Sequence, residues 1–157
     1  MTSARVTMCV VVGTLLLSGL ASAQDQEKRI KRSELPAGVE KAVVAQSQGS
    51  TIRGFSQEKE NGRTFYEAEL ITNGHSKDVL MDEDGNVVEV EEQVPMDSLS
   101  PSVGAALQSK AGSGRIVKVE SLTKKGKLVA YEAQVRTNGK KSEIQVGPQG
   151  ESLAHEE

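Results

Sequence analysis

The sequence is poor in cysteine and in aromatic residues. It has one cysteine, two phenylalanines, two tyrosines and no tryptophan among 157 residues, and its formal net charge is −3. Nucleic-acid binding relies on a positive surface and on aromatic stacking platforms, so we expect no nucleic-acid partner. Because the single cysteine, Cys9, lies in the N-terminal segment, the rest of the chain has no thiol for a disulfide or for thiol chemistry.

Residues 1–23 are typical of a secretory signal peptide. Arg5 precedes an apolar run from Met8 to Leu17, and Ala21-Ser22-Ala23 has the small-x-small pattern of a cleavage site. The run is shorter than the ~20 apolar residues that a transmembrane helix needs. We therefore expect a mature protein that begins at Gln24, has no membrane anchor after cleavage, and is periplasmic or secreted.

The predicted mature chain divides at changes in composition. Residues 24–34 are charged and contain a single apolar residue, Ile30, which favours a flexible charged leader. Residues 35–92 form a first predicted unit, residues 93–98 a linker, and residues 99–157 a second unit.

The two units share a sequence pattern. The segment Phe65–Gly74 (FYEAELITNG) returns as Ala130–Gly139 (AYEAQVRTNG), and the leucines, valines and turn glycines around it also recur in order. Self-similarity of this length indicates a tandem repeat of one structural unit.

Each unit is predicted to be one helix followed by four strands. Pro36 suits the first turn of a helix, and Val39 and Val43 follow at helical spacing. Asn-Gly and Asp-Gly dipeptides then mark tight turns between extended stretches. The predicted strands of the first unit are 51–59, 63–72, 75–81 and 86–91. The sequence thus predicts an α+β fold of two tandem α-β-β-β-β units, each a four-stranded antiparallel meander sheet covered by one helix.

These motifs resemble a known class of exported domain. The Leu35-Pro36 helix start, the Tyr-Glu-Ala strand, the Asn-Gly turn and the Asp-x-Asp-Gly turn resemble PepSY-like domains of secreted bacterial proteins. The tandem arrangement also resembles the beta-lactamase-inhibitor-like fold. The resemblance implies a small extracytoplasmic module that binds proteins or peptides, with some such modules associated with protease control. It does not imply inhibition of a beta-lactamase, because those inhibitors use aromatic surfaces and disulfides that this chain lacks.

Residues that could carry chemistry do not form a recognisable catalytic or metal-binding pattern. In Asp82-Glu83-Asp84-Gly85 the glycine follows the second aspartate too early for a calcium loop, so we interpret this segment as a hairpin turn. His75 and His155 have no partner at a metal-ligand spacing. No serine lies in a nucleophile elbow. We expect no catalytic residue, no cofactor and no metal site.

Alternation along one strand separates a core face from a candidate binding face. Tyr66, Ala68 and Leu70 alternate with polar neighbours and predict the core face, and Tyr131 holds the matching position in the second unit. The opposite face should be exposed and able to bind a partner. Its predicted members are Phe65, Glu67, Glu69 and Ile71 in one unit, and Ala130, Glu132, Gln134 and Arg136 in the other.

The sequence therefore predicts an exported, non-enzymatic module that binds a protein or peptide, with a basic partner favoured by the acidic face. Such a module could modulate or inhibit an extracytoplasmic enzyme such as a protease. One alternative is a metal- or ligand-sensing periplasmic module that uses the acidic turn Asp82–Asp84 with Glu89 and Glu91. A small hydrolase is a third hypothesis, disfavoured by the lack of a catalytic pattern.

Overall fold

The structure is a computed structural model that describes residues 27–60, 62–155 and 157. The predicted signal peptide and the first residues of the predicted leader lie outside the described residues. None of the helices in this part of the chain is long and apolar enough to cross a membrane.

The described chain is mostly β-structure. Its strands are β1 (Lys28–Ile30), β2 (Ser50–Glu60), β3 (Arg63–Thr72), β4 (His75–Asp82), β5 (Val87–Gln93), β6 (Arg115–Lys124), β7 (Lys127–Thr137) and β8 (Lys140–Val146). Its α-helices are α1 (Ala37–Gln46) and α2 (Pro101–Ala111), and short 3-10 helices precede them, η1 (Arg32–Glu34) and η2 (Met96–Ser98).

Local sequence explains where the two α-helices begin. The Ser100 hydroxyl accepts a hydrogen bond from the Val103 N–H at 3.3 Å, and Pro101 occupies the first helical position of α2. At a helix N-terminus the first backbone N–H groups have no partner within the helix. The Ser100 hydroxyl bonds one of them, and Pro101 has no N–H that would need a partner. The helix α1 begins directly after Pro36, whose ring fixes φ near −59°.

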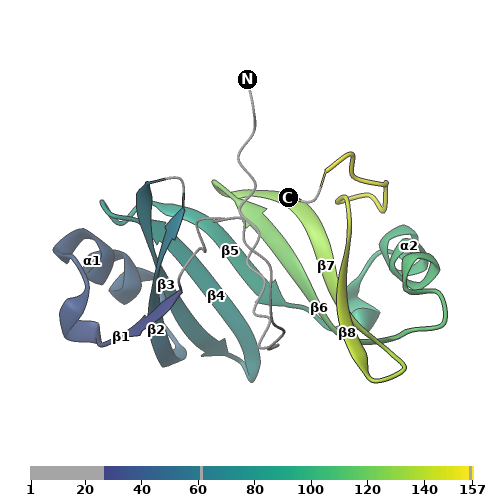
Figure 1. The fold of residues 1–157 in the computed structure, drawn as a ribbon, viewed down its shortest axis with the longest axis horizontal. Coiled ribbons are helices and arrows are strands. Elements are labelled where there is room, and N and C mark those ends of the chain that lie inside the picture. The colour runs from purple at the N-terminus through teal and green to yellow at the C-terminus, as the bar shows by residue number, and fades with distance from the viewer. Residues whose placement is uncertain (1–26, 61, 156) are drawn as a thin grey trace, which may run out of the picture.

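All eight strands form one antiparallel sheet in the order β1-β2-β3-β4-β5-β6-β7-β8, so that neighbours in the sequence are neighbours in the sheet (Figure 1). Three connections in the described part of the chain are two-residue turns with positive φ at both positions. Between β6 and β7, Lys125 and Gly126 have φ of 50° and 75°. Asn73 and Gly74 have φ of 53° and 85°, and Asn138 and Gly139 have φ of 50° and 81°. These values suit type I′ turns, which match the twist of the strands that they join.

Both helices cover the same face of the sheet, one near each end (Figure 1). Paired residues on adjacent strands share a face, and the register runs from Ala68 through Val79 to Val90, and from Val119 to Ala133. These residues pack toward the helices. We call the other side, formed by the alternate residues of each strand, the helix-free face.

The helix-covered face holds two separate hydrophobic cores. The first buries Val39, Val43, Phe55, Tyr66, Ala68, Leu70, Val79 and Met81. The second buries Val103, Leu107, Val119, Ala133 and Val146, with Tyr131 partly buried against it. The predicted core positions of both tyrosines are thereby confirmed.

The predicted fold class is wrong. The described residues form one eight-stranded antiparallel sheet with two α-helices, not two tandem four-stranded units that each carry a sheet and a helix. The sheets merge because β5 pairs with β6, with Glu89–Gln93 opposite Glu120–Lys124. This pairing satisfies the backbone groups of two strands that would otherwise be exposed edges.

The strand content also differs at both ends. Lys28–Ile30, which we expected in a flexible leader, forms β1 beside Phe55–Gln57, and Ile30 packs against the first core. At the other end, the described residues of 151–157 form no strand, although the sequence predicted a last strand there. The Gly147 N–H instead donates to the Glu151 carbonyl at 2.8 Å, which turns the chain after β8.

Candidate functional site: the helix-free face

The predicted binding-face residues all lie on the helix-free face, but several of them are not exposed. Phe65 and Glu67 are each only 6% exposed, which contradicts the expected exposed phenylalanine. The Arg63 guanidinium lies over the Phe65 ring, 5.1 Å from its centroid. Glu69 and Ile71 are half-buried. Whether this face binds a partner stays a prediction.

In the second half of the sheet, the predicted residues make polar contacts within the protein. Glu132 accepts a hydrogen bond from the Gln145 side-chain amide at 2.8 Å. Gln134 lies between Lys118 and Glu143 on the neighbouring strands, and Arg136 is exposed.

The centre of the helix-free face gathers carboxylates from four adjacent strands. The strand register places Glu67 opposite Leu80, and Leu80 opposite Glu89. One row further along, Asp78 lies opposite Glu91. Because paired residues share a face, these side chains converge. We call the group the carboxylate cluster; its members are Glu67, Asp78, Glu89, Glu91 and Glu120.

A hollow in the surface is lined by four members of the carboxylate cluster together with Leu80. Three of the five carboxylates are buried, with Glu67, Glu89 and Glu120 at 6%, 5% and 3% exposed. Charged groups are seldom buried to this extent without a partner, because burial removes their hydration.

Positive and polar groups inside the protein reach some of these carboxylates. The Lys118 ammonium lies 2.6 Å from Glu120, and the Lys124 ammonium lies 3.7 Å from Glu89. The Ser56 hydroxyl donates to Glu67 at 3.1 Å. Beside the cluster, Arg29 of β1 forms an ion pair with Glu69.

Burial raises the pKa of the two carboxylates with the largest shifts. The pKa of Glu91 is raised to about 9, chiefly by burial and then by repulsion from Glu120 and other nearby acids. The pKa of Glu67 is raised to about 8, again chiefly by burial and next by the charge of Asp78. Both effects favour the neutral acid over the carboxylate. At neutral pH these two side chains are therefore largely protonated.

Two other members shift less, because a lysine opposes the effect of burial. Burial raises the pKa of Glu89 to about 7 while Lys124 lowers it. Burial raises the pKa of Asp78 to about 6 while Lys118 lowers it. The cluster thus holds carboxyl groups that titrate across the range from mildly acidic to mildly basic pH.

Three members are close enough to share a cation. Asp78, Glu91 and Glu120 each offer a carboxylate oxygen, and these three oxygens lie within 4.8 Å of one another. Oxygen ligands suit calcium and magnesium. However, the Lys118 ammonium already supplies positive charge to Glu120.

The acidic turn Asp82–Asp84, which the sequence offered as a sensing site, is closed by its own hydrogen bonds. The Asp82 carboxylate accepts bonds from the backbone N–H groups of Asp84 and Asn86, at 3.1 and 2.8 Å. It also accepts from the Asn86 side-chain amide. The hydrogen bonds from Asn86 are the main reason that the pKa of Asp82 is lowered. This geometry agrees with our interpretation of the segment as a hairpin turn.

Sequence reasoning named Glu67, Glu89 and Glu91 but did not bring them together with Asp78 and Glu120. A usable signal existed within β5, where Val-Glu-Val-Glu alternates and places Glu89 and Glu91 on one face. The carboxylates of the four strands come together only through the register of β4 with β5 and of β5 with β6, and no local sequence pattern predicts these registers.

Comparison with known proteins shows the fold. No protein-family model matches the sequence, and no curated protein matches it. Among solved structures, a candidate periplasmic protein from Bacteroides eggerthii superposes with a TM-score of 0.61 at 20% identity, covering 74% of this chain and 84% of that one.

Two further structures support the same architecture. A DUF2874 family protein from Bacteroides ovatus has a TM-score of 0.58 at 21% identity, covering 74% of this chain and 82% of its own. A BLIP-like protein from Bacteroides fragilis has a TM-score of 0.56 at 22% identity, covering 78% and 85%. A BLIP-like fold is therefore supported, while the specific resemblance to PepSY-like domains stays a prediction.

Proposed function

We propose that the protein is an exported, periplasmic, non-enzymatic module that binds a basic protein or peptide on its helix-free face. The observation that carries the proposal is the carboxylate cluster, in which buried and half-buried acids gather from four strands and four of the five acids line one hollow. Export is supported by the predicted signal peptide and by the similarity to the B. eggerthii protein described as a candidate periplasmic protein.

The electrostatics of the cluster explain why a basic partner is favoured. Glu67 and Glu91 are held largely neutral at neutral pH because burial disfavours their charge. A lysine or arginine placed beside them would restore the charged form and gain a charge-assisted hydrogen bond. Half-buried Ile71, together with Leu80, which lines the hollow, supplies apolar contact beside the acids. A mixture of apolar anchors and opposite charge is typical of protein interfaces.

By binding an exported enzyme, such as a protease, the module would modulate or inhibit that enzyme. Support for it comes from the BLIP-like fold, because the relative from B. fragilis is described as BLIP-like. A binding module acts by occupying a surface, so its effect on a partner enzyme is measured as loss of that enzyme's turnover.

Site-specific photo-crosslinking tests the proposal. A photoreactive amino acid at Glu69, on the helix-free face, should capture a partner from the exported protein fraction. The same group at Val44, which is 50% exposed on α1, is the matched control and should capture little. A partner crosslinked equally from both positions would contradict the proposed face.

The captured partner is then titrated against the Glu69→Lys variant. We expect its affinity to fall by about tenfold or more, since each 1.4 kcal/mol of lost interaction is about tenfold in Kd. The melting temperature should change little, because half-buried Glu69 forms its ion pair with Arg29, whose side chain is largely exposed. Undiminished affinity would show that the acids of this face do not steer the partner.

Divalent cations separate binding of a basic partner from cation sensing. If the carboxylate cluster binds a divalent cation, millimolar calcium or magnesium will raise the melting temperature, and Glu91→Gln will abolish this rise. We expect no such rise beyond a general salt effect, because lysines already neutralise part of the cluster. The exposed acid Glu83 provides a matched Glu→Gln control.

A further inference from the structure

The strand β8 is an edge of the sheet on its side away from β7. Among the described residues, no strand pairs with it there. The Asn138-Gly139 turn closes on the pair Thr137–Lys140, which a two-residue hairpin makes a hydrogen-bonded pair. Hydrogen-bonded and non-hydrogen-bonded pairs alternate along the ladder. The backbone N–H and C=O groups of residues 141, 143 and 145 therefore point away from β7.

In the first half of the sheet, the strand β4 corresponds to β8, and its outer side is paired with β5. In β4 the residues 76, 78 and 80 bear the same relation to the Asn73-Gly74 turn, and their side of the strand is occupied by β5. There Lys77 lies opposite Glu92, and Asp78 lies opposite Glu91. The strand β5 is antiparallel and reads VVEVEEQ, which places acids on both of its faces.

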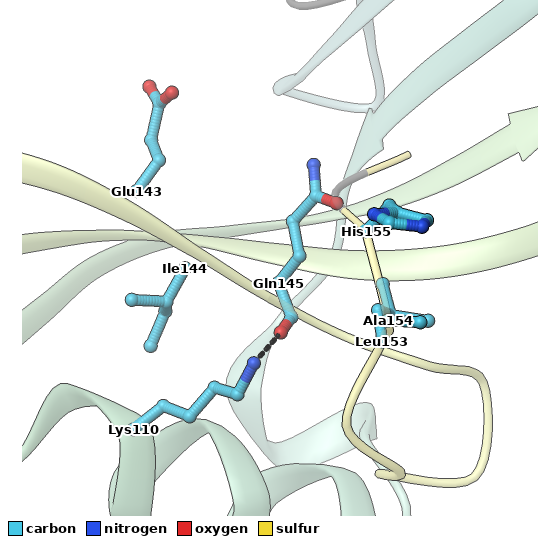
Figure 2. Close-up of a pocket in the computed structure, with 7 residues that line it drawn as sticks. All are labelled: Lys110, Glu143, Ile144, Gln145, Leu153, Ala154 and His155. Carbon is cyan, nitrogen blue, oxygen red and sulfur yellow. Dashed lines mark hydrogen bonds between the residues drawn. The ribbon is translucent and has the colours of Figure 1, made fainter. Parts of the chain in front are cut away.

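Beside β8 the corresponding position holds a pocket of about 350 Å³, shown in Figure 2. This volume is at the lower end of the ~300–1,000 Å³ range of ligand pockets. The pocket is lined by Lys110 of α2, by Glu143, Ile144 and Gln145 of β8, and by Leu153, Ala154 and His155 of the following segment.

One outward-facing group of the edge is already hydrogen-bonded by a side chain. The Lys110 ammonium donates to the Gln145 carbonyl at 2.7 Å, along the dashed line in Figure 2. That contact agrees with the outward direction deduced from the register. It also places a positive charge at one end of the edge, while exposed Lys140 and Lys141 stand at the other end.

Lysines on an edge strand also have a protective role, because they discourage unspecific pairing between sheets. The same lysines do not exclude a strand that carries acids, since opposite charges on paired strands stabilise the pairing. Within this sheet, the register likewise places Lys77 of β4 opposite Glu92 of β5. Lys110, Lys140 and Lys141 outnumber Glu143, the one acid of β8, so the charges along this edge favour an acidic strand.

We propose that the edge of β8 binds an extended, acidic segment of a partner protein as an additional antiparallel strand. The backbone groups of residues 141 and 143 and the Gln145 N–H would hold the segment, and its acids would meet the lysines at the two ends of the edge. The alternate side chains that face α2 would enter the pocket beside Ile144 and Leu153. This strand-addition site is separate from the helix-free face and takes a segment of the opposite charge.

A defined peptide tests the proposal with the full chain. The probe is a fluorescein-labelled heptapeptide with the β5 sequence, Val-Val-Glu-Val-Glu-Glu-Gln, followed by fluorescence anisotropy. We expect saturable binding that weakens about tenfold or more when the central valine of the peptide is replaced by proline, which removes one backbone donor. A scrambled peptide of the same composition that binds equally well would show charge attraction alone and overturn the proposal.

Variants at Lys141 test the edge from the protein side. Lys141→Pro removes an N–H that points away from β7, so the β7–β8 ladder is kept and the melting temperature should change little. We expect peptide affinity to fall about tenfold, while the matched Lys141→Arg variant binds like the parent. Equal binding by both variants would overturn the proposal, and the peptide variants keep this test valid if Lys141→Pro unfolds.

Two further measurements distinguish other occupants. If a second copy of the chain occupies the edge, sedimentation will show a dimer that Lys141→Pro converts to a monomer, which would overturn the partner-strand proposal. Glu69→Lys should leave peptide binding unchanged, because Glu69 lies on the helix-free face in the other half of the sheet. Failure of either proposed surface is therefore detected without the other.

Discussion

At the scale of single residues, the two tyrosines occupy matched positions but differ in burial. Tyr66 is only 8% exposed within the first core, and its hydroxyl accepts a hydrogen bond from the Gln57 amide at 3.2 Å. Tyr131 is half-buried at the side of the second core. Their removal should therefore not have equal effects.

We expect Tyr66→Ala to lower the free energy of unfolding by roughly 3–5 kcal/mol, the usual range for a buried aromatic side chain. Tyr131→Ala should cost clearly less, because part of the cavity is open to solvent. Urea unfolding of both variants gives the comparison. Tyr66→Phe is the control and should cost only about 1 kcal/mol for the lost hydrogen bond. Equal losses at the two tyrosines would contradict the difference in burial.

Residue-scale prediction from sequence succeeded for side chains that follow a local pattern and failed for those buried by distant strands. The alternation of Tyr66, Ala68 and Leu70 identifies the core face correctly. Glu67 was expected on a solvated surface, yet it is buried beside Ser56 and Leu80. Its environment comes from two neighbouring strands, and no feature near Glu67 in the sequence reports their packing.

At the scale of elements, the glycines of the two helices differ in their surroundings. A methyl group added to Gly38 in α1 would clash with the Asp84 carbonyl of the β4–β5 turn. Gly85 in the same turn has φ of +85° and lies against the Gly38 carbonyl. The helix and the turn are thus in backbone contact, which only glycine permits at both positions. In α2, a methyl group on Gly104 would meet no atom within 4 Å.

This difference predicts opposite effects of the same substitution. Gly104→Ala should stabilise the protein by about 0.5–1 kcal/mol, because alanine restricts the unfolded chain and favours the helix. Gly38→Ala should destabilise it, since the helix must move away from the turn. Thermal melts of the two variants are compared with the parent. A Gly38→Ala protein as stable as the parent would show that the contact is not tight.

Element boundaries were predicted well where turns or caps mark them. The Asn-Gly dipeptides at residues 73 and 138 end their strands as expected. The β5–β6 pairing was missed because Gln93 and Glu120 are joined through a helix and carry no mutual signal. The last predicted strand is absent for a related reason, since a strand needs a neighbour and the turn after Val146 leads the chain away from the edge.

At the scale of the whole molecule, the carboxylate cluster makes stability depend on pH. The pKa values of Glu67, Asp78, Glu89 and Glu91 are raised to about 8, 6, 7 and 9 in the folded protein. Folding therefore favours the protonated acids, and the folded state binds more protons than the unfolded state between the ordinary and the raised pKa values. The contribution of these four acids to stability is therefore greatest below the ordinary carboxylate pKa of about 4, and it is lost as pH rises toward about 9.

We expect the melting temperature to fall as the pH rises from about 5 to about 9. Glu91→Gln should flatten part of this slope and raise the melting temperature at pH 9 by on the order of 4 °C, the shift that about 1 kcal/mol produces in a chain of this size. The exposed control Glu83→Gln should leave the slope unchanged. A pH-independent melting temperature in the parent would show that the acids are hydrated.

The separation of the two cores has a mechanical consequence. Each helix fixes one end of the sheet, whereas the helix-covered side of the β5–β6 junction carries the polar residues Glu92, Ser121 and Thr123. Twist between adjacent strands varies readily when no packed layer holds it. We therefore expect the sheet to bend more easily along this line than at its two ends, which would change the spacing of the carboxylates on its other side.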